Sequence, residues 1–140
     1  MPDYTPPYAP GRIVTLTVSA AVTARDLLVV SGSGTVAKAA ANASTSWVGV
    51  AGNDTPINGR CTVFGRGIIH ESIADGTVTA GDQVGTTSTA GRQVKTVAVQ
   101  DVGGAPSQAT INAALVALRG VAGIALTTAA DGLIVRWMEI

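Results

Sequence analysis

Residues 22–28 read VTARDLL, and residues 78–84 read VTAGDQV. Val, Thr, Ala and Asp recur at matching positions, with an offset of 56 residues. One short match in a chain rich in alanine, valine and threonine is weak evidence for a repeat. The fold therefore depends on whether the flanking sequence repeats in the same order.

A second match lies downstream, where WVGVA at residues 47–51 resembles VAGIA at residues 121–125. Each segment is followed by a loop that contains Asp and then Gly, and by an apolar strand that carries an aromatic residue, Phe64 or Trp137. The conserved order predicts two related β-units, with Phe64 and Trp137 in equivalent core positions. We place the halves at about residues 12–72 and 73–140.

The composition favours strands joined by turns. The chain has 140 residues and 17 glycines, and is 46% hydrophobic but only 13% charged, which is not typical of a long-helix protein. The length suits a single domain with its own core. We therefore predict a mainly β fold, a compact β-barrel-like domain of two related units around one core, because a closed barrel removes exposed strand edges.

Alternation locates individual strands. In residues 12–18, Val14, Leu16 and Val18 face one way and the threonines face the other, which is typical of a half-buried strand. Other strands are expected at residues 26–30, 35–39, 47–51, 60–72, 93–99, 121–126 and 133–140. The segment at 60–72 is either one long strand or two strands with a glycine bend at Gly65 and Gly67.

One helix is expected, at residues 107–119. Ile111, Leu115 and Leu118 recur at helical spacing, Ser107 is a candidate N-cap, and Gly120 follows as a stop signal. The helix lies in an insertion of about twenty residues, at 97–120, that the first unit lacks.

The VTA-x-D element reads as a turn. Gly81 can adopt a positive φ, and Asp82 can accept hydrogen bonds from nearby backbone amides. Arg25 replaces this glycine in the first copy, so a left-handed residue is not required there. Asp26 and Asp82 are interpreted as turn residues and not as metal ligands.

The N-terminal arm, residues 1–11, contains Pro2 and the interface candidates Tyr4, Pro6, Pro7, Tyr8 and Pro10. Proline fixes φ and biases the preceding residue toward extended geometry, so the arm cannot join a helix. It is either a frayed end or a segment that docks on a neighbouring subunit.

A search for chemistry finds no catalytic, cofactor-binding or metal-ligating set, and we expect no enzyme activity. Cys61 is interpreted as a buried strand residue, and His70 and Glu71 point to opposite faces of their strand. The net charge is zero and the basic residues are scattered, which argues against nucleic acid and anionic membranes as partners. The sequence shows no signal peptide and no transmembrane helix.

Four stretches resemble the capsid decoration, or cement, proteins of tailed bacteriophages, notably those of actinobacteriophages. The resemblance is carried by residues 8–39, 47–71 and 76–84, and by 121–140, which reads VAGIALTTAADGLIVRWMEI. It implies a β-rich protein made in the host cytoplasm and placed on the outer capsid surface, often as a homotrimer. There it would bind the major capsid protein and hold its subunits together. No catalytic residues come with this resemblance.

Two other classes of protein stay open. One is another virion part, such as a head fibre base or a tail component. The other is a small β-module that binds a sugar or another ligand. A binding module usually offers several aromatic side chains for stacking, whereas here two of them lie in the arm and the others lie on predicted strands.

Overall fold

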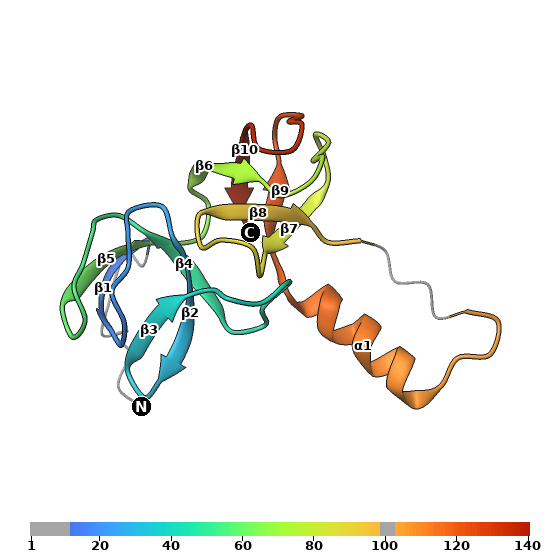
Figure 1. The fold of residues 1–140 in the computed structure, drawn as a ribbon, viewed down its shortest axis with the longest axis horizontal. Helices are drawn as coiled ribbons and strands as arrows, with labels where there is room; N and C mark the ends of the chain where they lie inside the picture. Colours follow the sequence, from blue (N-terminus) through green and yellow to red (C-terminus); the bar gives the residue numbers. More distant parts are fainter. Residues whose placement is uncertain (1–11, 99–102) are drawn as a thin grey trace, which may run out of the picture.

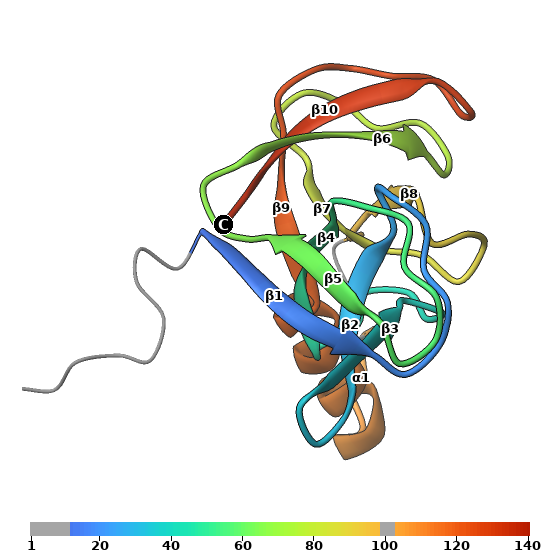
Figure 2. The same ribbon diagram turned by 90° about the vertical axis from the view of Figure 1, so that its left-hand side faces the viewer.

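The computed structural model describes residues 12–98 and 103–140, and shows two five-stranded β-barrels and one helix (Figures 1 and 2). The first barrel contains β1 (Ile13–Val18), β2 (Leu27–Gly32), β3 (Thr35–Lys38), β4 (Trp47–Ala51) and β5 (Arg60–Phe64). The second contains β6 (Ile69–Ala74), β7 (Gln83–Thr86), β8 (Gln93–Thr96), β9 (Val121–Ala125) and β10 (Ile134–Glu139). The helix α1 (Gln108–Arg119) lies between β8 and β9.

The two barrels have the same topology. The first closes in the order β1-β3-β2-β4-β5 and the second in the order β6-β8-β7-β9-β10. In each barrel the first and third strands are parallel, and the other neighbours are antiparallel. The repeated VTA-x-D element, which opens on Val22 or Val78, thus leads into the second strand of each barrel.

The hydrogen bonds of the repeated turn also recur. The amide of Thr23 donates to Asp26 Oδ2 at 2.8 Å, and the amide of Thr79 donates to Asp82 Oδ2 at 2.9 Å. The interpretation of both aspartates as turn residues is confirmed. However, Arg25 has a φ of 75° and Gly81 a φ of 94°, so the expectation that Arg25 could avoid the left-handed region was wrong. The shared hydrogen bonds hold both turns in one conformation.

The mainly β fold, the two related units and the single helix are confirmed. The prediction of one common core was wrong, because each unit closes on itself and the two barrels have separate core clusters. The residues 69–72, which we placed in the first half, belong to β6 and pair with β10 of the second barrel. Gly67 has a φ of 80°, in the connection between β5 and β6, and the segment at 60–72 therefore forms two strands.

The predicted equivalence of Phe64 and Trp137 is wrong by one residue. In the first barrel Ile13 pairs with Phe64 and Val14 with Val63; in the second, Ile69 pairs with Met138 and His70 with Trp137. Trp137 therefore corresponds to the buried Val63, and Phe64 corresponds to Met138. A shift of one residue in a strand moves a side chain to the opposite face, so Trp137 is fully buried whereas Phe64 is only half-buried.

The connection between β3 and β4, residues 39–46, joins the barrels. The amide of Ala43 donates to the carbonyl oxygen of Thr86 at 2.9 Å, and Thr86 Oγ1 donates to the carbonyl oxygen of Ala41 at 2.7 Å. A Cβ atom on Gly120 would overlap the carbonyl oxygen of Ala43, so the two backbones meet where only glycine fits. Figure 1 shows this teal loop reaching across to the end of α1.

Apolar contacts extend across the same junction. Leu27, Ala39 and Val50 of the first barrel belong to the core cluster of the second. The rings of Trp47 and Trp137 lie 5.9 Å apart, which is within the range of aromatic pairs. The barrels are therefore joined by both backbone hydrogen bonds and a shared apolar layer.

The helix forms as predicted. Ser107 caps it, because its Oγ accepts from the amide of Thr110, and the Thr110 hydroxyl accepts from the amide of Ser107 in return. Gly120 is the C-cap residue. None of the helix residues is buried by the described part of the chain, and the helix projects away from both barrels (Figure 1).

Candidate interaction surfaces

The structure places the residues singled out in the sequence in different environments. Tyr4, Pro6, Pro7, Tyr8 and Pro10 lie outside the described residues. Cys61 is fully buried on β5, as predicted, where its thiol lies 3.3 Å from the carbonyl oxygen of Thr62.

His70 and Glu71 point to opposite faces of β6, as strand alternation predicted. The His70 side chain is buried, whereas Glu71 faces outward and accepts a hydrogen bond of 2.9 Å from Arg136 Nε. Sequence analysis missed the group that does contact His70, namely Glu139, whose Oε2 lies 3.3 Å from His70 Nε2. The alternation of β10 carried the signal, because it places Glu139 on the same face as Val135 and Trp137.

Trp137 is the centre of this polar cluster. Its indole Nε1 donates to Ser72 Oγ at 2.9 Å, and its ring centroid lies 4.9 Å from that of His70. Glu139 is only 2% exposed, so its carboxyl group requires a partner, and His70 supplies one. The cluster is buried and its polar groups satisfy one another, which indicates a structural role.

A cleft of about 500 Å³ lies between the barrels. It is lined by Arg25, Phe64 and neighbouring residues of the first barrel and by Ile69, His70, Glu71 and Arg136 of the second. Since the Glu71 and Arg136 side chains already form an ion pair, the cleft presents mixed charges and apolar side chains but no convergent set of acids or bases.

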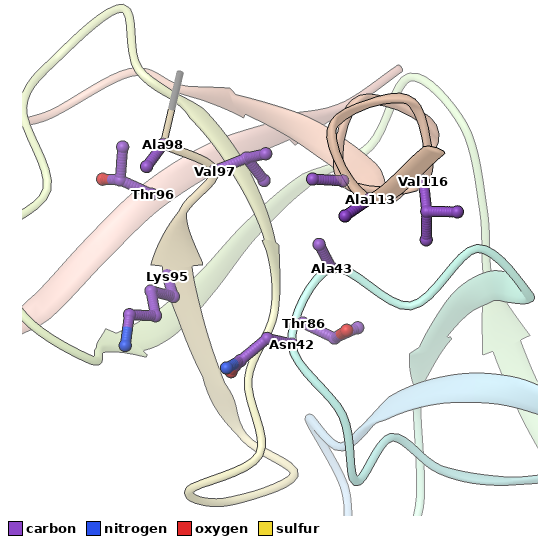
Figure 3. A pocket seen from close by; sticks show the side chains of 10 residues that line it. Asn42, Ala43, Thr86, Lys95, Thr96, Val97, Ala98, Ala113 and Val116 are labelled. Atoms are coloured by element: carbon purple, nitrogen blue, oxygen red, sulfur yellow. The ribbon is translucent and has the colours of Figure 1, made fainter. Parts of the chain in front are cut away.

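One exposed apolar surface of the described residues is on α1. Its exposed side chains are Ile111, Leu115, Val116 and Leu118, and its single charged residue is Arg119. Figure 3 shows the space under the helix, a groove of about 400 Å³ between Ala113 and Val116 on α1 and residues of β8 and of the 39–46 loop. A helix with this composition is normally covered by another element.

A second surface is the outer face of β6 and β10. Ile69 lies beside Met138 and Ile73 beside Ile134, with the Glu71–Arg136 ion pair between the two apolar pairs. All four apolar side chains are exposed. In the first barrel the corresponding face contains Ile13 and Phe64, then two threonines, Thr15 and Thr62, and then Thr17 and Arg60. The two barrels therefore share one apolar pair on this face, and only the second barrel has another, Ile73 with Ile134.

Within residues 12–98 and 103–140, no group of three or more His, Cys, Asp or Glu side chains could hold a metal ion. In the same ranges, no helix is both long and apolar enough to cross a bilayer.

The architecture, a tandem pair of five-stranded barrels with an inserted helix, resembles a solved phage structure. The crystal structure of the head fibre gp8.5 N base in bacteriophage phi29 superimposes with a TM-score of 0.55 and 17% sequence identity. The match covers 91% of this chain and 92% of the head fibre base, so it includes both barrels and shows that the two proteins share a fold. The chain matches no protein-family model and no curated protein sequence.

Proposed function

We propose that this chain is a structural protein of a phage virion that binds the outer capsid surface and stabilises contacts between major capsid protein subunits. The observation that carries the proposal is the fold likeness to a phage head fibre base over nearly the full length of both chains. Because one fold can serve unrelated functions, the proposal also relies on the sequence resemblance to capsid decoration proteins. In this role the protein acts as a homotrimer and requires no cofactor, nucleic acid or membrane.

The outer face of β6 and β10 supplies a surface suited to this role. It combines exposed Ile69, Ile73, Ile134 and Met138 with a central ion pair, and interfaces typically combine apolar contact area with some polar groups. Tyr4 and Tyr8 of the arm would add large contact area with polar tips. Many weak contacts, repeated within each oligomer, would add through multivalency.

A head fibre base is the second candidate, and the same fold likeness favours it. The two functions differ in position and copy number. A decoration protein occupies many equivalent capsomer junctions, whereas a fibre base lies only under fibres. Electron microscopy of purified virions, with this chain located by fitting its two barrels, distinguishes the two.

Re-binding to capsids stripped of the protein tests attachment directly. We expect Ile69→Glu to weaken decoration at least tenfold, because it places a charge on the apolar face of β6 and β10. The matched control is Ile13→Glu, since Ile13 and Ile69 are equivalent in the two barrels and are 57% and 59% exposed. Equal binding by both variants would exclude this face as the attachment surface.

The arm is tested in the same assay with a variant that begins at Gly11. We expect it to fold with unchanged thermal stability and to bind capsids more weakly than the full chain, because proline-rich segments lose little entropy on ordering. Decoration as tight as that of the full chain would mean that the arm is a frayed end.

A further inference from the structure

The connection between the third and fourth strands differs between the two barrels. In the first barrel it is residues 39–46, and in the second it is residues 97–120, which is three times as long and contains α1. The short connection lies on the second barrel, as the hydrogen bonds to Thr86 show. Residues 12–98 and 103–140 form two barrels, and within these ranges the long connection has no further barrel on which to lie.

The surface that the short connection covers has an equivalent on the first barrel. Thr86 pairs with Val94 in the second barrel, and Val30 pairs with Val36 in the first, so Thr86 and Val30 are equivalent positions. Thr86 is buried under the 39–46 loop, whereas Val30 is 53% exposed. The first barrel therefore leaves open the site that the second barrel has covered.

The chemistry of the open site matches the helix. Val30 borders a groove of about 140 Å³ that is lined by the apolar side chains of Leu16, Val36 and Val48, together with Gly32, Gly34 and Thr35. No charged side chain lines it. In the covered site, polar groups of the 39–46 loop form hydrogen bonds with Thr86 and Ser88. In the open site, an apolar groove would contact Leu115 and its exposed apolar neighbours on α1.

We infer that α1 docks on the Val30 groove of the first barrel of a second copy of this chain. Within a chain, the connection between the third and fourth strands of the first barrel lies on the second barrel. The proposed contact repeats this arrangement between two chains. It is head-to-tail, because the helix and the groove are different surfaces, and head-to-tail contacts close into a ring when the rotation between subunits allows it. The inference deepens the oligomer in the proposed function but does not depend on attachment to a capsid.

The size of the contact predicts its strength. A 12-residue helix is about 18 Å long, and the area it can cover lies well below the ~800 Å² per partner of a standard stable interface. The assembly is therefore expected to depend on protein concentration, unless the barrels themselves also touch, as they do within the chain.

Sedimentation velocity of the purified protein, at concentrations up to about 100 µM, tests the inference. We expect the wild-type chain to sediment as an oligomer, and Leu115→Asp and Val30→Asp each to sediment as a 13.9 kDa monomer. Both side chains are more than half exposed, so thermal unfolding should stay within a few degrees of wild type. Leu133→Asp is the control: Leu133 is 60% exposed and directly precedes β10, which lies away from α1 in both ribbon views, so this variant should remain oligomeric.

Mixing the two monomeric variants gives the decisive result. Val30→Asp retains an intact helix and Leu115→Asp retains an intact groove, so the mixture should form a species of two chains and stop there. A monomeric wild-type chain at the highest concentration would overturn the inference. It would also be overturned if Val30→Asp remained oligomeric while Leu115→Asp did not, since this would mean that helices pack against each other. Capsid binding is measured separately, so failure of the one proposal leaves the other open to its own test.

Discussion

The two barrels share all their strand pairings but differ in what fills them. Four positions of the first barrel, Val14, Leu16, Val63 and Gly65, correspond to four positions of the second: His70, Ser72, Trp137 and Glu139. The first set is apolar or small. In the second set, a buried indole N–H bonds to the serine, and the histidine contacts both the indole ring and the buried glutamate. In the second barrel, the buried indole of Trp137 is thus accommodated together with polar partners.

The largest expected effect on stability is at Trp137, the residue that most distinguishes the second barrel from the first. Trp137→Ala should reduce the free energy of unfolding by about 3–5 kcal/mol, because the fully buried indole leaves a cavity and orphans the Ser72 hydroxyl. Val63→Ala, at the equivalent position, removes only two methyl groups and should cost about 2 kcal/mol. Chemical denaturation of both variants measures the difference, and equal losses would contradict the pairing of His70 with Trp137 and of Val14 with Val63.

The junction between the barrels gives the next largest effect. Gly120→Ala should cost about 1–3 kcal/mol or more, because its Cβ would overlap the carbonyl oxygen of Ala43 and force the 39–46 loop to shift. The equivalent position in the first barrel is Ser46, which already carries a side chain, and Ser46→Ala should change stability by less than ~0.5 kcal/mol. Thermal unfolding compares the two. A neutral Gly120→Ala would show that the loop can move away freely.

The repeated turn predicts smaller changes in stability, of opposite sign in the two barrels. Arg25→Gly should stabilise the protein by about 0.5–1 kcal/mol, because glycine adopts the φ of 75° without steric strain. Gly81→Ala should destabilise by about 1–2 kcal/mol for the same reason. Urea denaturation measures the change in the free energy of unfolding for both variants. If the two changes had the same sign, the two turns would not share a left-handed conformation.

The smallest expected effect concerns acid stability. The Thr87 hydroxyl donates to Asp75, and this hydrogen bond, with that of Thr89 and the charge of Lys95, lowers the pKa of Asp75. A carboxyl whose folded pKa is depressed stabilises the fold above its unfolded pKa of about 3.9, and the stabilisation is lost as the pH falls through the folded pKa.

The equivalent of Asp75 and Thr87 in the first barrel is a neutral pair, Ser19 and Ser31, whose hydroxyl oxygens are 2.6 Å apart. Asp75→Asn should therefore flatten the dependence of stability on pH below about 4, whereas Ser19→Ala should leave it unchanged. Unfolding midpoints measured between neutral pH and about pH 2.5 provide the test. An unchanged pH profile in Asp75→Asn would mean that the hydrogen bonds do not favour the ionised form.

Much of this architecture was predictable from the sequence. Strands with clear alternation, the capped helix and the repeat all carry local signals, and β4 has the predicted bounds. The errors came from non-local structure. Phe64 and Trp137 were matched by chemical type, whereas cross-strand register assigns Val63 to Trp137. The contact of His70 with Glu139 joins residues that are 69 positions apart, and no local pattern encodes such a pair.

The candidate surfaces were less predictable than the fold. Helical spacing of Ile111, Leu115 and Leu118 is the same for a covered helix and an exposed one, so only the structure shows that this face lacks a partner. The apolar groove at Val30 is likewise formed by side chains from separate strands. Both surfaces depend on tertiary geometry that periodicity does not contain.

Each barrel takes its five strands from one continuous part of the chain, and this has a consequence for synthesis. All the strands of the first barrel, up to Phe64 that pairs with Ile13, leave the ribosome before any strand of the second barrel does. The first barrel can therefore fold while its Leu27 and Trp47 face is still uncovered, and the second barrel then folds against a preformed template. We expect nascent chains halted soon after Ala74 emerges to resist proteolysis within residues 13–64, whereas a chain whose halves fold only together would be cut throughout.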